Sequence, residues 1–210
     1  KWCSNCCLSH SAYLKFHTAL NKMKKILPII LGLSTACSVT AQTWKYDLGS
    51  GKVANGYTQV TPDTKFNYTT GFGFDRGSVV KSVERKDKDA LRCDFITGDK
   101  PFYFYVKLPE GNYDVKLILG DKEGTSATTV RAECRRLFLQ NIKTKQGEIV
   151  EKTFTVHVKD SLIRDANGTI ISKVKLKARE INYLHWDNLL TIEFNDSLAK
   201  VCGIEITRNT

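Results

Sequence analysis

Short runs of alternating hydrophobic and polar residues fill most of the chain after residue 43, and Gly, Pro, Asn and Asp separate them. A period of two, with many aromatic and β-branched residues, is typical of strands that bury one face. The predicted strands cover residues 43–48, 102–108, 113–119, 127–134, 135–142, 151–158, 172–178, 189–194 and 201–207. No window shows a sustained helical period. The pattern therefore predicts an all-β fold, an antiparallel β-sandwich of jelly-roll type.

Turn residues support this strand assignment. A Pro and a Gly stand in 108–112, and an Asn-Gly pair in 165–169 suits a type I′ hairpin turn. Residues 195–197 are expected to bend after a strand. The segment 49–101 is looser and rich in glycine, and it lacks the Lys-Ser/Thr ending and the following helix of a phosphate-binding loop. We therefore expect loops there, where ligand contacts often lie on a β-sandwich.

The first 41 residues have a different character. From Met23 the sequence combines a basic start, the apolar stretch 26–33 and small residues before Gln42, which is the pattern of a secretory signal peptide cleaved after Ala41. Its apolar core is shorter than the roughly 20 residues of a transmembrane helix, so we expect no transmembrane anchor. We expect residues 1–22 to be a disordered upstream extension.

Residues 42–210 are then expected to form one secreted or periplasmic β-sandwich domain. Alternatively, the protein is exported as a lipoprotein with the lipid on Cys37 in "LSTAC". Ser34 argues against this alternative, because lipoprotein signals usually have Leu at that position. Cys93, Cys134 and Cys202 remain in this domain, so at most one disulfide can form, and no C-x-x-C spacing indicates a metal site.

The net charge of the domain is modest. Removing the leader takes away Lys1, Lys15, Lys22, Lys24 and Lys25 and no acidic residue, which lowers the formal charge from +10 to +5. The remaining excess is not gathered in a continuous Lys/Arg block. This favours an anionic partner weakly and does not favour nucleic acid.

The stretch "FNDSLAK" includes three quarters of a G-D-S-L esterase signature, with Ser197 in the place of the nucleophile. Such a serine needs a helix after it, a histidine as general base and oxyanion donors. Only 13 residues follow Ser197 and none is His. We therefore interpret Ser197 as a polar turn residue. A stand-alone esterase that pairs Ser197 with His185 is the remaining catalytic alternative, because the order of a triad in sequence does not fix its geometry.

Five stretches carry a family resemblance. They are "YDLGSGKVANGYTQVTPDTKFNYTTGFGFD" (46–75), "LPEGNYDVKLILGD" (108–121), "TTVRAECRRLFLQNIKTKQGE" (128–148), "KTFTVHV" (152–158) and "LHWDNLLTIEFN" with "AKVCGIEI" (184–206). They resemble the N-terminal β-domain of bacterial rhamnogalacturonan acetylesterases, carbohydrate esterases of the SGNH or GDSL class. The resemblance implies a galactose-binding-like jelly roll ahead of a catalytic α/β domain. The G-D-S block of those enzymes follows the equivalent of "VCGIEI" (201–206), so no catalytic residue is expected here.

The resemblance implies a non-catalytic accessory module of a pectin-deacetylating esterase. Its expected partners are acetylated pectin, another plant cell-wall glycan, or an SGNH esterase domain that it positions without binding sugar. Aromatic rings would stack on sugars and arginines would bind carboxylates. The candidate ligand residues are Tyr57, Phe72, Phe74, Arg76, Arg85, Arg135, Tyr183 and Trp186.

No cofactor is expected, although a structural calcium ion near the chain termini is possible for a sandwich of this type. The candidate oxygen ligands are Asp47, Glu193 and Asp196. There is no dense acidic loop of the EF-hand kind.

Overall fold

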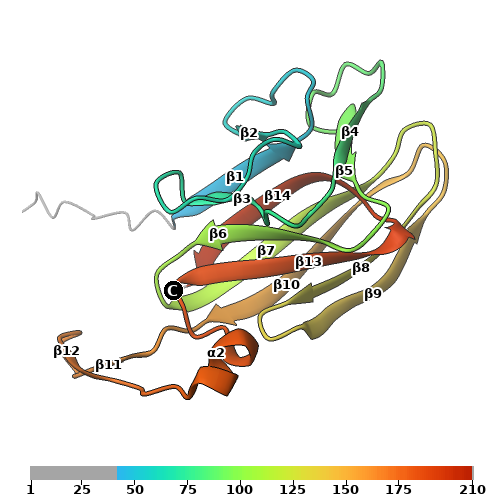
Figure 1. The fold of residues 1–210 in the computed structure, drawn as a ribbon. Coiled ribbons are helices and arrows are strands. Elements are labelled where there is room, and N and C mark those ends of the chain that lie inside the picture. Colours follow the sequence, from blue (N-terminus) through green and yellow to red (C-terminus); the bar gives the residue numbers. More distant parts are fainter. Residues whose placement is uncertain (1–41, 210) are drawn as a thin grey trace, which may run out of the picture. The chain divides into compact units, whose positions relative to one another are not determined.

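The computed structural model describes residues 42–209, except for the side chains of Asn182 and Tyr183. This part is a β-sandwich of two packed sheets with one short helix, so the predicted all-β sandwich is confirmed (Figure 1). The expected upstream extension, signal peptide and lipidation site lie outside the described residues. Among the described residues, no helix has the length and apolar character needed to cross a membrane.

The first sheet has seven strands. They are β1 (Thr43–Leu48), β2 (Thr58–Val60), β4 (Lys81–Glu84), β5 (Asp94–Thr97), β7 (Gly111–Gly120), β10 (Ile149–Val158) and β14 (Lys200–Asn209). Their main order is β10-β7-β14-β1-β2, and β5 joins β14 to β4. β1 and β2 pair in parallel, which corrects the expectation of a purely antiparallel sandwich.

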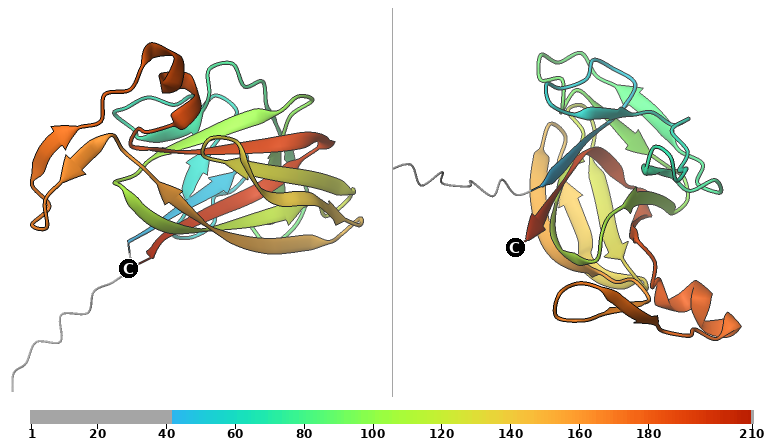
Figure 2. Two further views of the ribbon diagram at one scale, coloured as in Figure 1. Left: turned by 90° about the horizontal axis from the view of Figure 1, so that it is seen from below. Right: turned by 90° about the vertical axis from the view of Figure 1, so that its left-hand side faces the viewer.

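The second sheet has five strands and lies over the first (Figure 2). They are β3 (Phe72–Phe74), β6 (Phe102–Lys107), β8 (Ser126–Ala132), β9 (Arg136–Thr144) and β13 (Leu189–Leu198), in the order β3-β6-β13-β8-β9. Alternate residues of each strand point between the sheets. Phe102 stacks on Phe194 and Phe104 packs against Tyr46, all of them buried, so aromatic side chains fill the space between the layers.

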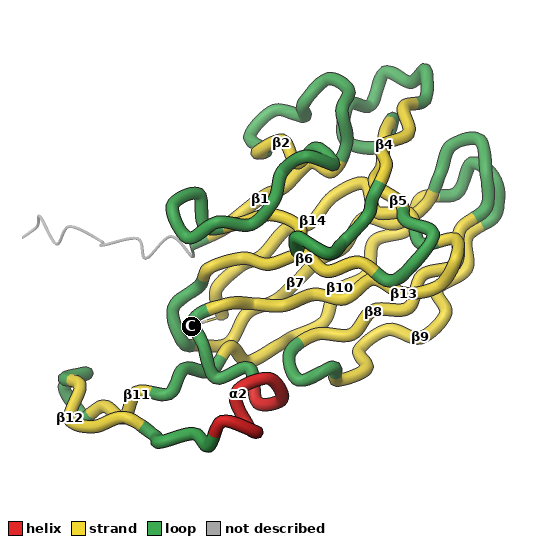
Figure 3. Tube along the Cα trace, in the orientation of Figure 1, coloured by secondary structure: helices red, strands yellow, loops and turns green. Residues whose placement is uncertain are grey.

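An excursion made of residues 159–188 leaves the sandwich between β10 and β13 (Figures 2 and 3). It contains the hairpin β11 (Leu162–Arg164) and β12 (Ile170–Lys173), followed by the short helix α2 (Ala178–Leu184). The predicted strand 172–178 is therefore wrong beyond residue 173. The Glu180 carboxylate accepts a hydrogen bond from the Lys177 backbone N–H at 2.9 Å, which caps the first turn of a helix.

Two turn predictions need correction. In the β11–β12 hairpin only Gly168 has a positive φ (82°), whereas a type I′ turn would need one at Asn167 as well. The bend expected at 195–197 is a bulge within β13, where Asp196 has φ 85° and Ser197 is exposed. The strand continues to Leu198, and only Ala199 separates it from β14.

Candidate functional site

A hollow of about 620 Å³ opens at the end of the sandwich where β1 begins and β6 ends. Residues from both sheets and from the loops before β2 and β3 line it. They are Thr43, Trp44, Lys45, Tyr46, Gly56, Thr58, Tyr68, Thr69, Thr70, Gly71, Phe72 and Lys107. The size matches the range of small-ligand sites.

The loop that forms one wall of the hollow is ordered by its own sequence, "NYTTG" (67–71). The Asn67 side-chain oxygen accepts hydrogen bonds at 2.9 Å from the backbone N–H groups of Thr69 and Thr70. Gly71 has φ 78°, and its carbonyl accepts the Lys107 N–H at 2.7 Å. This Asx turn fixes the loop against the end of β6 and holds Tyr68 outward.

Tyr68 is the exposed aromatic residue of this wall, with 63% of its surface accessible. Its ring packs edge-on against Phe66, with centroids 5.2 Å apart, and Phe66 packs in the same way on Tyr105 of β6. Phe66 can lie there because the segment 64–66 runs directly over Gly73, where an added Cβ would be 2.6 Å from backbone atoms. Glycine at 73 therefore sets the position of the Tyr68 ring.

The floor of the hollow is aromatic. Phe72 packs on Tyr46 with ring centroids 4.9 Å apart, and Trp44 meets Tyr113 edge-on at 5.9 Å. Burial is the cause that raises the pKa of the Tyr46 hydroxyl, so this group stays neutral. Tyr46 and Tyr113 are buried beneath the half-buried Trp44 and Phe72, so the floor can offer ring surface to a sugar only from Trp44 and Phe72.

The charge of the hollow has one sign. Four threonines supply hydroxyl groups, Lys107 is exposed at the rim, and none of the described residues that line it is Asp or Glu. Lys45 also lines it, although its ammonium group lies 5.4 Å from the centroid of the Tyr57 ring. A ligand with apolar C–H faces, hydroxyl groups and negative charge suits this lining.

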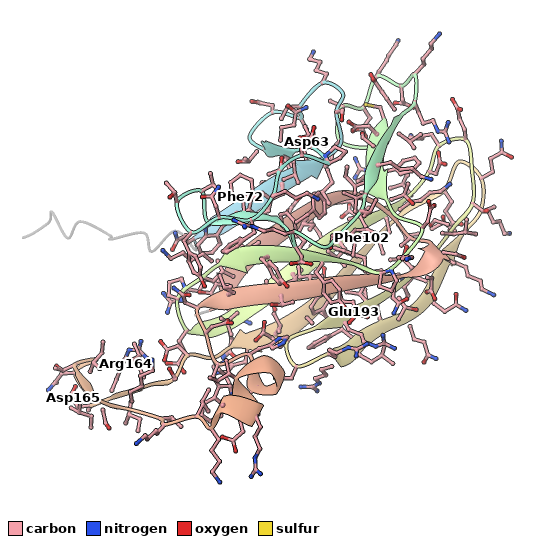
Figure 4. All side chains as sticks on the ribbon, viewed as in Figure 1. Asp63, Phe72, Phe102, Arg164, Asp165 and Glu193 are labelled. Carbon is pink, nitrogen blue, oxygen red and sulfur yellow. The ribbon has the colours of Figure 1, made fainter. Side chains whose placement is uncertain are left out.

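Of the eight residues predicted to contact ligand, Phe72 lines the hollow. Its side chain is labelled in Figure 4. Phe74 is fully buried in the core and has no exposed ring face, so its predicted role is wrong. Tyr57 lies on the outer side of the first sheet, where its hydroxyl donates to the Glu205 carboxylate. The side chain of Tyr183 lies outside the described part of the chain.

The predicted arginines are not gathered at one site. Arg85 forms a bidentate pair with Asp121, at 2.9 and 3.0 Å, which corrects its assignment as a free carboxylate ligand. Arg76 is exposed in the loop after β3. Arg135 is 68% exposed in its side chain but pairs with Glu193 at 3.3 Å. Trp186 is half-buried, and its backbone bridges to Lys159 in the excursion.

The three predicted calcium ligands do not come together. Asp47 alternates with inward residues of the first sheet, and Glu193 alternates with inward residues of the second, so they face opposite sides of the sandwich. The Glu193 carboxylate is occupied by Arg131 at 3.0 Å and by Arg135. No group of three or more His, Cys, Asp or Glu within residues 42–209 could hold a metal ion.

Ser197 and His185 are not partners either. His185 precedes β13 and Ser197 lies near its far end, so eight residues of strand, roughly 25 Å, separate Leu189 from Ser197. The left-handed φ of 42° at His185 ends α2. The described residues do not bring a serine–histidine pair together at this motif.

Sequence reasoning missed Tyr68, Trp44 and Lys107 as site residues. Tyr68 was overlooked because the loop before β3 had no periodic pattern, although "NYTTG" contains the Asn and Gly of an Asx turn. Trp44 and Lys107 were read only as strand residues. Their place at strand ends that meet in space depends on the pairing of distant segments.

A family model assigns this β-sandwich to a known protein family. Residues 44–170 match the family model "Beta-agarase/YXIM esterase-like, galactose-binding domain-like", which is more than half of the chain. The chain belongs to this family. The resemblance to an N-terminal β-domain of carbohydrate esterases is thereby supported in its coarser form, as a galactose-binding-like module of esterase- and agarase-type proteins.

Two curated relatives give the context. The chain is 24% identical over 160 residues to the "Uncharacterized esterase YxiM" of Bacillus subtilis (strain 168), covering 72% of this chain and 40% of the relative. It is 29% identical over 125 residues to "Beta-agarase A" of Zobellia galactanivorans, covering 57% of this chain and 22% of that protein. The chain thus spans less than half the length of these relatives.

Solved structures agree on the fold. The crystal structure of YxiM superposes with a TM-score of 0.55 at 20% identity, covering 80% of this chain and 40% of that one. The ANX1 ectodomain of Arabidopsis thaliana superposes with a TM-score of 0.51 at 8% identity, covering 81% of this chain and 50% of that one. At these identities the likeness concerns the fold alone.

Proposed function

We propose that this protein is a non-catalytic, glycan-binding accessory module of a secreted carbohydrate esterase system, and that its ligand is an acidic plant cell-wall glycan such as acetylated rhamnogalacturonan. The observation that carries the proposal is the hollow, with its aromatic floor, exposed Tyr68, hydroxyl groups and lysine rim without a carboxylate. The sequence resemblance to rhamnogalacturonan acetylesterases supports the choice of glycan. A purely structural domain that orients an esterase is the alternative.

The stacking role of Tyr68 can be tested by substitution. Tyr68→Ala is expected to weaken binding of rhamnogalacturonan about tenfold, because losing an aromatic contact that carries binding energy costs on the order of 1–2 kcal/mol. Affinity gel electrophoresis and titration calorimetry of the purified protein at low salt measure the change. The fold should be unaffected, since Tyr68 is mostly exposed.

Leu137→Ala serves as the matched control for this measurement. Leu137 is also exposed (47%), but it lies on β9, at the opposite edge of the second sheet from β3. Its substitution is expected to leave binding unchanged. If the wild-type protein is not retarded by any acidic glycan at low salt, the binding function is wrong and the structural alternative remains.

A further inference from the structure

The excursion carries a row of cationic side chains. Lys173, Lys175, Lys177 and Arg179 occupy every second position, and all four are exposed. Between them Val174 and Leu176 are half-buried, so burial alternates as it does along an extended chain. Alternate residues of an extended backbone are roughly 7 Å apart, which places the three lysines along one side.

The row is strongly basic for its length. Residues 170–179 include four basic residues and no acidic one, whereas residues 42–210 as a whole have a formal charge of +5. The row is therefore a local cluster of four positive charges. The alternate spacing hid this cluster in the sequence, because it does not form a continuous basic block.

The four cations are not neutralised within the described residues. None of them takes part in an ion pair there. The neighbouring Arg164, in contrast, is paired with Glu110 at 2.8 Å and with Asp160 at 2.5 Å. The Glu180 carboxylate accepts from the Lys177 backbone N–H. The row is thus open to an external anion.

The backbone of the row is held in place. The Val174 N–H donates to the Ser161 carbonyl at 2.7 Å, and the Cys134 thiol lies 3.0 Å from the Leu184 carbonyl just after the row. The first contact ties the start of the row to another part of the excursion, and the second ties the end of α2 to the segment between β8 and β9. The backbone is thus anchored at Val174 and again at Leu184.

β6 ends and β13 begins at the same end of the sandwich (Figure 1), where the excursion departs and the hollow opens. Lys107 at the rim of the hollow pairs with Leu189 at the start of β13, directly after the excursion. The Leu108 N–H donates to the Asn188 carbonyl at 2.9 Å. A long ligand that leaves the hollow past Lys107 therefore meets the segment from which the excursion departs.

We propose that the row Lys173–Arg179 is a second binding surface for a linear polyanionic glycan, the same chain whose sugars occupy the hollow; this rests on the proposed function. Lysine ammonium groups on flexible stems bind a series of repeating anions without demanding one geometry. The choice of a glycan rests on the hollow, whose ring surfaces and hydroxyl groups suit sugars.

The test compares two triple variants that remove equal charge. Lys173→Gln/Lys175→Gln/Lys177→Gln is expected to weaken binding of polygalacturonate about tenfold or more in low salt. It should also flatten the dependence of log Kd on log salt concentration, because fewer counterions are released on binding. The control Lys143→Gln/Lys145→Gln/Lys152→Gln changes three exposed lysines elsewhere and should bind nearly as wild type.

Further polymers identify the anion. Fully methyl-esterified pectin, which lacks the charges, should bind weakly and equally to wild type and to the row variant. A sulfated galactan tests sulfate esters as the anions. If it binds more tightly than polygalacturonate and the row variant loses this binding to the same extent, the row is supported and its anions are sulfate esters. Duplex DNA bound as tightly as either glycan would overturn the assignment to a glycan.

Failure of this inference differs from failure of the proposed function. If wild type binds polygalacturonate and Tyr68→Ala weakens it, but the row variant behaves as wild type, the row is not a binding surface and the hollow stands. Equal losses in both triple variants would also overturn the row, since only overall charge would then matter. If wild type binds no acidic glycan, both fail.

Discussion

Replacing Asp121 with Asn is expected to lower the free energy of unfolding by about 3–5 kcal/mol at pH 7. The Asp121 side chain is fully buried and accepts hydrogen bonds from Arg85 at 2.9 and 3.0 Å and from Lys200 at 2.6 Å. Both cations also pack over the ring of Phe95. Without the carboxylate they lose their shared counter-charge and repel each other. Urea unfolding followed by circular dichroism measures the difference.

The free energy of unfolding of Asp121→Asn is also expected to decrease less at low pH than that of the wild-type protein. Burial by itself raises the pKa of Asp121, but hydrogen bonds from Arg85, Lys200 and the Glu123 N–H outweigh it and hold the pKa well below its usual range. A lowered pKa in the folded state gives stability that is present above the pKa of an unfolded Asp, about 4, and is lost as the pH falls. The difference in the free energy of unfolding between wild type and variant should therefore be smaller at pH 3 than at pH 7.

Asp99→Asn is the control for this prediction. Asp99 forms an ion pair with Lys81 at 3.0 Å, with both side chains largely exposed, and such pairs contribute less than about 1 kcal/mol. Asp99→Asn is therefore expected to change the free energy of unfolding by less than about 1 kcal/mol. If Asp121→Asn is no more harmful than Asp99→Asn, the buried pair does not stabilise the domain as described.

The long strands could be predicted because each has a local pattern that matches its environment. In 102–108 the residues that alternate toward the core are Phe102, Phe104 and Val106, all buried, and the sequence alone shows the same alternation. The two packed layers follow from such patterns, since each strand has one face to bury.

The segment 49–101 could not be predicted in the same way. β2 and β3 have only three residues each, and they exist because they pair with β1 and β6, which lie elsewhere in the sequence. Phe74 shows the consequence for the site. A phenylalanine in a glycine-rich loop looked like a sugar platform, but pairing with β6 places it in the core.

The segment 172–178 shows how a correct local pattern can give a wrong element. Its alternation of lysines with apolar residues reflects a real difference in exposure, because Val174 and Leu176 are half-buried and the lysines are not. A strand also needs a partner for its backbone, and beyond Lys173 the segment has none in the described sheets. The alternating pattern therefore identified which side chains are exposed, but it could not show whether the segment pairs with another strand.

A second buried carboxyl group, that of Asp47, behaves in the opposite sense to Asp121. One of its oxygens accepts the Ala54 N–H at 2.7 Å, and the other is buried without a partner among the described residues. Burial is the main cause that raises the pKa of Asp47 to about 6; the hydrogen bond from Ala54 lowers it in part, and the nearby Asp94 and Asp89 raise it. The folded domain therefore disfavours the ionised form.

The contribution of Asp47 to the free energy of unfolding is accordingly expected to fall as the pH rises from 4 to 8. The unfolded Asp ionises near pH 4, whereas Asp47 in the fold keeps its proton to about pH 6, so ionising it in the fold costs about 3 kcal/mol at pH 8. Asp47→Asn keeps an acceptor for Ala54 and cannot ionise, so it should be the more stable protein at pH 8 and about equal at pH 4. Urea unfolding at both pH values, with exposed Asp63→Asn as the control, measures this. A variant less stable than wild type at pH 8 would show that the ionised carboxylate stabilises the fold.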